Sequence, residues 1–259
     1  MVDALLENHL AFLAAHRGAV RRSADAIEVL GESDEFSAWI PLTPDAEVPP
    51  EVRTVRLVPW SGPGWEERLV AAGFEPAEVL VHMEAPWAGE LADAGPRGSA
   101  VDTGEAVEAV GEEVVPAVVA DADAVGFAEV QGAAFLEVGE PDYDWWQKMF
   151  VEKAVQNYRA PDQSFYLIRV DDDPAASTLV LRTGPVVGVY AVATKPQYRG
   201  RGLATRLLAQ ARRDAAGGRL TLQVVEGSDA ERLYLSLGFR PAFRSPHFRR
   251  PSEVRSGLS

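Results

Sequence analysis

Residues 189–205, with the sequence VYAVATKPQYRGRGLAT, place the strongest constraint on the fold of this chain. The first five residues are β-prone and precede Pro196, and Gly200 and Gly202 come just before a helix-like run that begins at Leu203. This order predicts a strand, a glycine turn and a helix whose first N–H groups have no partner within the helix. Such N–H groups, together with the helix dipole, favour an anion.

The glycine turn differs from the two common phosphate-binding motifs. No Gly-Lys-Ser or Gly-Lys-Thr follows the glycines, which argues against an ATP or GTP P-loop. The three spaced glycines of a dinucleotide-binding turn are absent as well. We therefore expect a pyrophosphate held by backbone amides, without a hydroxyl that binds magnesium.

Two motifs in the C-terminal half occur together at the spacing of one enzyme family. The first is Arg or Gln, two residues, Gly, one residue and then Gly or Ala, and it is matched by Arg199-Gly200-Arg201-Gly202-Leu203-Ala204. The second is matched by Ala230-Glu231-Arg232-Leu233-Tyr234, followed after three residues by Gly238-Phe239. Over about the last 145 residues the chain resembles the GNAT family, the Gcn5-related N-acetyltransferases.

The resemblance implies how the chain would bind acetyl-CoA. In the family, pantetheine lies between two splayed strands, here the strand ending at Thr194 and the strand at 220–225, and the Val192 N–H faces the acetyl oxygen. The amides of residues 200–205 and the Thr205 hydroxyl would hold the pyrophosphate. The residues expected to bind the cofactor are Val192, Ala193, Thr194, Arg199, Gly200, Arg201, Gly202, Leu203, Ala204 and Thr205.

The resemblance assigns the proton transfers only in part. Tyr234 matches the family tyrosine that protonates the departing thiolate, with a buried core tyrosine as the structural alternative. Glu226 is the candidate base, acting through water. His247 is the alternative base, although a lone His is more often structural. Gly227 departs from the family pattern, because many members have Asn there. The chain has no Cys, which excludes a cysteine acyl-enzyme, a disulfide and a thiolate metal site.

Charge is divided unevenly along the chain. The net charge is −14, yet residues 195–259 hold 13 Lys and Arg against 5 Asp and Glu, a net of +8. One stretch without acids contains Lys195, Arg199, Arg201, Arg206, Arg212 and Arg213. This stretch suits the phosphates of coenzyme A, although a solvated basic helix face would have the same composition. The acidic remainder would repel a phosphate backbone, so we expect no nucleic-acid partner.

The hydrophobic pattern predicts an α/β protein with helices flanking a mixed, mostly antiparallel sheet. In the N-terminal part we expect a helix at 2–16, an antiparallel meander of strands at 26–30, 36–42 and 53–60, a helix at 64–72 and a strand at 78–83. A glycine-rich, acidic connector at 85–113 follows. We therefore expect a smaller N-terminal domain, residues 1–110, and a catalytic domain, residues 111–259.

In the catalytic domain the same signals alternate between strands and helices. Strands are expected at 114–119, 164–170, 177–181, 189–193, 220–225 and 240–248, and helices at 123–135, around 145–155 and at 203–215. A further helix should begin at Ser228, because Ser228 and Glu231 form a capping box.

A short repeat links the two halves. Gly73-Phe74-Glu75-Pro76 has the same pattern as Gly238-Phe239-Arg240-Pro241. The repeat suggests that the N-terminal half is a reduced second copy of the same fold, with Leu69 in the place of Tyr234 and no glycine turn before it. A chance match between two junctions of helix, glycine and strand is the alternative.

Two acidic clusters invite a functional interpretation. One crowds a loop that borders the acceptor cleft in the family, and its members Glu137, Glu140, Asp142 and Asp144 are the expected substrate-binding residues. An acidic rim favours a cationic acceptor, although a solvated acidic loop is the alternative. The other cluster, Asp171 to Asp173, has no further ligands at loop spacing, so we expect a hairpin turn and no metal.

These features predict an acetyl-CoA-dependent N-acetyltransferase that transfers the acetyl group directly to a primary amine of a small molecule or peptide. The alternative is a non-catalytic CoA-binding sensor that uses the same glycine turn. No run approaches the roughly 18 apolar residues of a membrane span, and the N-terminus lacks signal-peptide features. We expect a cytoplasmic protein without membrane contact.

Overall fold

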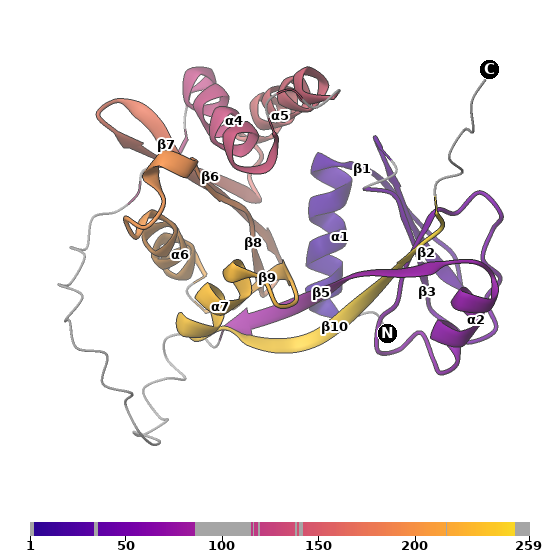
Figure 1. Ribbon diagram of the computed structural model, residues 1–259. Coiled ribbons are helices and arrows are strands. Elements are labelled where there is room, and N and C mark those ends of the chain that lie inside the picture. Colours follow the sequence, from indigo (N-terminus) through magenta and orange to yellow (C-terminus); the bar gives the residue numbers. More distant parts are fainter. Residues whose placement is uncertain are drawn as a thin grey trace, which may run out of the picture. The chain divides into compact units, whose positions relative to one another are not determined.

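The computed structural model describes residues 3–33, 36–85, 115, 117, 118, 120–137, 139, 142–215 and 217–251. Its contacts divide the chain into two compact units (Figure 1). Unit 1 comprises residues 1–84 and 223–259, and unit 2 comprises residues 85–222. The C-terminal segment therefore packs with the N-terminal one, and the predicted boundary near residue 110 lies outside the described residues.

Unit 2 is a sheet with helices on both faces (Figure 1). Strands β6, β7 and β8 are antiparallel neighbours, and β9 begins parallel to β8. Helix α4 packs against β6, β7 and β8 and against α5, while α6 packs against β7 and β8. Because helices cover both faces, the middle of β7 is buried throughout. The bounds are α4 Asp121–Phe135, α5 Tyr143–Asn157, β6 Gln163–Val170, β7 Asp173–Thr183, β8 Val186–Thr194, η1 Pro196–Tyr198, α6 Leu203–Asp214 and β9 Arg219–Val225.

The acidic run at residues 171–173 forms the expected hairpin turn between β6 and β7. Val170 pairs with Asp173, so Asp171 and Asp172 are the two loop residues. Their φ angles are 49° and 67°, the left-handed conformation that a tight hairpin requires and that Asp tolerates. The hairpin interpretation is confirmed.

Unit 1 is built on six strands in the order β1-β2-β3-β4-β10-β5. The last strand of the chain, β10, lies between β4 and β5 and is antiparallel to both. Helix α1 packs on β1 and β2. The bounds are α1 Ala4–His16, β1 Gly18–Arg22, β2 Ala26–Gly31, β3 Ala38–Pro41, β4 Thr54–Arg56, α2 Trp65–Ala71, β5 Glu75–Ala85, α7 Asp229–Ser236 and β10 Arg240–Arg249.

The predicted fold class is confirmed, but two details of the strand prediction are wrong. β3 and β4 are parallel, with Trp39 opposite Val55, because the connection between them crosses over instead of turning back. Strand β1 was not predicted. Of the strand expected at 114–119, the described residues contain one isolated bridge, from Ala117 to Tyr166.

The two faces of the unit 1 sheet carry different side chains. Val55 and Phe248 are cross-strand partners and belong to an apolar core with Trp65 and Leu69 of α2. Because side chains alternate along a strand, the next pair, Arg56 and His247, emerges on the opposite face. No helix among the described residues is both long and apolar enough to cross a membrane.

Candidate active site

A bulge interrupts β8 at the point where the sequence predicts the acetyl-binding backbone. Ser177 pairs with Ala193 and Leu179 pairs with Tyr190, so Ala191 and Val192 together face Thr178. Ala191 has a φ of 54°, in the left-handed region that non-glycine residues rarely adopt. A bulge of this kind changes the direction of the next peptide groups, here those of the half-buried Val192.

A buried glutamine holds this bulge. Gln131 of α4 is 4% exposed, and its Nε2 donates to the Ala191 carbonyl at 2.8 Å and to the Ser177 hydroxyl at 2.7 Å. The buried Thr178 hydroxyl donates to the Tyr190 carbonyl at 3.0 Å. Sequence analysis missed Gln131, although a lone amide on the apolar face of a helix was the available signal.

The parallel pairing of β8 with β9 is short. It joins Val186, Val187 and Gly188 to Arg219, Leu220 and Thr221, whereas β8 continues to Thr194. Val192, Ala193 and Thr194 therefore lie beyond the part of β8 that pairs in parallel with β9, although Ala193 and Thr194 still pair with β7. Peptide groups on a strand edge that has lost its partner can bond a ligand that inserts there.

The predicted glycine turn has the conformation that an anion site needs. Gly200 and Gly202 have φ angles of 75° and 71°. Apart from each glycine's chain neighbours, no atom of the described residues lies within 4 Å of where a Cβ would stand. Helix α6 begins at Leu203 without a side-chain cap. The open space beside both glycines thus adjoins the first N–H groups of a helix, which fits a phosphate group.

The side chains of the turn are arranged around Asp173. The Lys195 side chain, 11% exposed, donates to Asp173 Oδ1 at 2.9 Å. Tyr198 of η1 also hydrogen-bonds Asp173, and these two contacts lower the pKa of that carboxyl. The Arg201 guanidinium lies 5.3 Å from the Tyr198 ring centroid. Asp173, the first residue of β7, therefore holds the residue before η1 and the last residue of η1.

The other residues of the turn leave it open to solvent. Arg199, Gly200, Arg201 and Gly202 are exposed, and the Arg199 Nε donates back to the Thr194 carbonyl at 3.4 Å. Leu203 is buried beneath the turn, while Ala204 and Thr205 are half-buried in the first turn of α6. The structure thus brings the ten predicted cofactor residues together within unit 2.

Tyr234 lies in unit 1, on α7, behind the predicted capping box. The Ser228 hydroxyl accepts from the Glu231 N–H at 3.2 Å, which confirms that helix start. The Tyr234 side chain is 7% exposed, and burial raises its pKa to about 12. The phenol is therefore protonated at neutral pH.

The two candidate bases also lie in unit 1, and each already has a partner. Glu226 is exposed, and the Arg244 Nε donates to its carboxylate at 2.6 Å. His247 is buried with its Nδ1 3.1 Å from Glu78 Oε1, and burial, followed by the nearby Arg56, lowers its pKa to about 3. A low pKa makes His247 a weak proton acceptor, and its buried position contrasts with the exposed position of Glu226.

The predicted acceptor loop is described in part. Glu137, Asp142 and Asp144 are exposed, and Glu140 lies outside the described residues. Asp142 precedes α5 without capping it through its side chain. Trp145, in the first turn of α5, is 44% exposed and packs edge-on against Trp146. The loop therefore presents carboxylates beside an exposed aromatic ring.

The repeat between the two halves extends to the backbone. The Phe74 N–H donates to the Leu69 carbonyl at 2.9 Å, and the Phe239 N–H donates to the Tyr234 carbonyl at 3.0 Å. Gly73 and Gly238 have φ angles of 82° and 85°. Helix α2 follows the parallel strands β3 and β4 in the chain, and α7 likewise follows the parallel strands β8 and β9.

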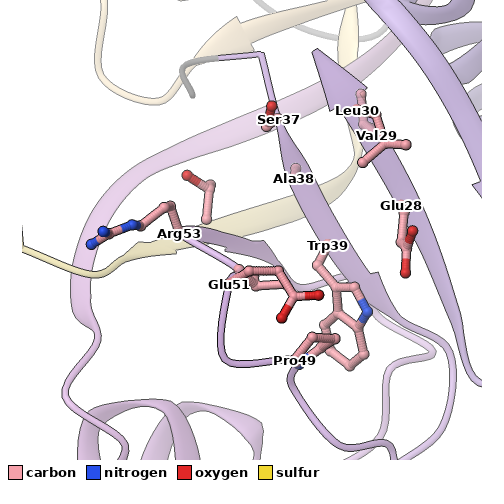
Figure 2. A pocket seen from close by; sticks show the side chains of 11 residues that line it. Glu28, Val29, Leu30, Ser37, Ala38, Trp39, Pro49, Glu51 and Arg53 are labelled. Carbon is pink, nitrogen blue, oxygen red and sulfur yellow. The ribbon is translucent and has the colours of Figure 1, made fainter. Parts of the chain in front are cut away.

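A pocket opens at the parallel strand pair of unit 1 (Figure 2). Its volume is about 200 Å³, and residues from β2, from β3 and from the segment before β4 line it. Figure 2 shows Trp39, Pro49 and Glu51 close together, while Arg53 extends away from them. Glu28 also lines the pocket, which therefore has two carboxylates and one guanidinium.

Comparisons with known proteins find one family that resembles part of the chain. Residues 161–241 match the family model of an acetyltransferase (GNAT) domain. No curated protein matches the chain.

Solved structures resemble the chain in fold. A GCN5-related N-acetyltransferase from Kribbella flavida is 19% identical over 97% of each chain, with a TM-score of 0.59. A functionally unknown conserved protein from Staphylococcus epidermidis is 13% identical over 89% of this chain and 92% of its own, with a TM-score of 0.60. A tandem GNAT protein from the clavulanic acid biosynthesis pathway is 14% identical over 88% of this chain and 80% of its own, with a TM-score of 0.51.

Proposed function

We propose that this chain, whose residues 161–241 match the GNAT acetyltransferase family model, transfers the acetyl group of acetyl-CoA directly to a primary amine. The family match confirms the resemblance inferred from the two sequence motifs. The observation that carries the proposal is the open glycine turn, Gly200 to Gly202, which leads into the uncapped start of α6 close to the bulge in β8.

Binding in this proposal uses backbone groups of unit 2. The first N–H groups of α6 and the glycine turn hold the pyrophosphate, with the Thr205 hydroxyl beside them. Pantetheine lies along the unpaired edge of β8 at Val192 to Thr194. The bulge held by Gln131 directs the Val192 N–H at the acetyl oxygen, where negative charge develops during transfer.

The chemical step needs two proton transfers and no covalent enzyme intermediate. An ammonium acceptor first releases one proton to solvent. The neutral amine nitrogen then attacks the acetyl carbon, the carbon–sulfur bond breaks, and the sulfur receives the phenolic proton of Tyr234. The proton lost by the nitrogen passes through water to Glu226 and then restores the phenol. A phenol pKa of about 12 exceeds that of a thiol, about 8.5, so Tyr234 acts first as a hydrogen-bond donor to the sulfur.

The proposed acceptor is a cationic amine of a small molecule or peptide. The exposed carboxylates Glu137, Asp142 and Asp144 attract an ammonium group, and the exposed Trp145 ring offers it a cation–π contact. The proposal therefore favours polyamine-like or basic acceptors over amines that carry several carboxylates.

The test is thiol release from acetyl-CoA in the presence of a panel of cationic, neutral and carboxylate-bearing amines. We expect release with the cationic amines, and we expect Tyr234→Phe to lower kcat by about 100-fold or more with unchanged CoA affinity. Tight CoA binding without thiol release for any amine would favour the CoA-binding sensor over the enzyme. Preferred turnover of carboxylate-rich amines would overturn the proposed acceptor class.

A further inference from the structure

A cluster of nitrogen-bearing side chains lies on the sheet face of unit 1 that α1 approaches. Arg56 comes from β4, His82 from β5 and His9 from α1, and they are 7%, 2% and 8% exposed. The Arg56 Nη1 lies 3.5 Å from His9 Nε2, and the His9 and His82 rings meet edge-on with centroids 5.6 Å apart. Gln223 hydrogen-bonds His9. The cluster is therefore contiguous.

The charge of Arg56 is not balanced within this cluster. Burial lowers the pKa of Arg56 to about 10, so the guanidinium is charged at neutral pH. The nearby acid, Glu78, contacts His247 at 3.1 Å and Arg249 at 2.9 Å instead. No carboxylate in the described part of the chain forms an ion pair with Arg56. A buried charge without a counterion is costly, and such a site favours an anion.

Three polar atoms around His9 have unused hydrogen-bonding capacity. Arg56 Nε, His82 Nδ1 and Gln223 Nε2 are buried and make no hydrogen bond with any described residue. The His82 ring is fixed, because it stacks on Phe243 with centroids 4.1 Å apart. Arg56 Nε and Gln223 Nε2 are donors in every state, and neutral His82 can place its proton on Nδ1.

From this arrangement we propose that Arg56, His82 and Gln223 form a buried binding site for a small carboxylate. The guanidinium presents parallel N–H groups that match the two oxygens of a carboxylate, and His82 and Gln223, which contact the same His9 ring as Arg56, supply further donors. One guanidinium balances one negative charge. Because burial keeps His9 and His82 neutral, dianionic phosphate would leave one charge uncompensated. A spherical chloride matches two parallel donors less well than the two oxygens of a carboxylate do.

None of the three donors is among the residues assigned to acetyl transfer, and the proposed carboxylate site does not depend on the proposed function. The three donors come from β4, β5 and β9, and all belong to unit 1. Its ligand is a free carboxylate or the carboxylate of a larger metabolite, two sources that share the same chemistry.

The experiment uses the intact chain at pH 7.5 with sodium formate, a carboxylate small enough for a buried site. Formate should raise the melting temperature by about 3 °C at ten times its Kd, and sodium chloride and phosphate at equal ionic strength should not. Formate should also shift the imidazole ¹⁵N resonances of His82. Lactate and larger hydroxy acids, added in parallel, distinguish a free small anion from the carboxylate of a larger molecule.

Arg56→Met should remove both responses. The matched control is Arg53→Met, which deletes an exposed guanidinium three residues earlier on the same segment and should leave both responses intact. If Arg56→Met does not fold, the test is whether formate shifts the His82 ¹⁵N resonances of the unmodified chain. Equal effects of formate, chloride and phosphate, with unmoved His82 resonances, would show that these groups bind only water and would overturn the proposal.

Discussion

At the residue scale, Gly202 is required for two reasons: its backbone has a positive φ, and a phosphate group would lie close to it. Gly202→Val places a branched side chain at a φ of 71° and in the space where phosphate would lie. We expect this variant to lose the rise in melting temperature that acetyl-CoA gives the wild-type chain. The matched control is Gly217→Val, because Gly217 has a φ of 78° and equally open surroundings. A retained shift in the Gly202 variant would remove the turn from the site.

Asp173 permits a second test at a single residue. Asp173→Asn removes the charge that holds Lys195 and Tyr198, so the turn should lose its fixed position. We expect KM for acetyl-CoA to rise severalfold with a smaller change in kcat. Asp172→Asn removes a neighbouring exposed carboxylate of the same hairpin and should change neither value. If both substitutions raised KM for acetyl-CoA equally, the loss of one negative charge would explain the result, and the contacts of Asp173 would not be needed.

Sequence analysis predicted residues whose role depends on local backbone and missed those whose role depends on distant contacts. Gly200 and Gly202 were found because a turn before a helix requires their conformation. Gln131 and Arg56 were missed because their partners, Ala191 and His9, are 60 and 47 residues away in the chain. Composition gives no information on such pairs.

At the element scale, the bulge in β8 depends on one side chain from another element. Gln131→Leu keeps the volume but leaves the Ala191 carbonyl and the Ser177 hydroxyl without their donor. We expect a loss of about 1–3 kcal/mol of stability, because buried polar groups lose their partner. We also expect kcat to fall while KM for acetyl-CoA stays near wild type, because the Val192 N–H loses its direction.

The control for this prediction is Ser177→Ala, which removes one contact and leaves the bond from Gln131 to Ala191. It should lower stability without the fall in kcat. An unchanged kcat in Gln131→Leu, measured under conditions where the variant is fully folded, would show that the bulge does not contribute to catalysis.

The errors in the strand prediction also belong to this scale. The positions of β2, β3 and β4 followed from hydrophobic pattern and turn residues, but the parallel direction of β4 did not. A short buried strand has the same composition in either direction, and the crossover is set by packing of the whole sheet.

At the scale of the whole molecule, the buried histidines of unit 1 make stability depend on pH. Burial lowers the pKa of His82 and His247 to about 3 and that of His9 well below 6.5, with Arg56 adding repulsion in each case. Glu78 opposes this effect at His247, and Arg249 adds to it.

Because these folded-state pKa values lie below the unfolded value of about 6.5, the unfolded chain binds more protons between pH 6.5 and 3. Stability should be full above pH 6.5 and fall as pH decreases, by about 1.4 kcal/mol per pH unit for each proton taken up. Urea unfolding from pH 7.5 to 4 measures this slope. His82→Gln should reduce it by about one proton, and a flat profile would contradict the burial of neutral histidines.

The number of CoA molecules bound by the whole chain follows from comparing its two parallel strand pairs. β8 and β9 are joined through a glycine turn and α6, whereas residues 42–53, between β3 and β4, contain no glycine and no helix. The pocket at β3 is about 200 Å³ and has Glu28 and Glu51 in its lining, which would repel phosphates.

We therefore expect unit 1 to bind no CoA, and titration calorimetry on the intact chain to give one CoA per chain. Gly202→Val should abolish the heat completely. A stoichiometry near two, or binding that survives in Gly202→Val, would reveal a second site that does not use a glycine turn.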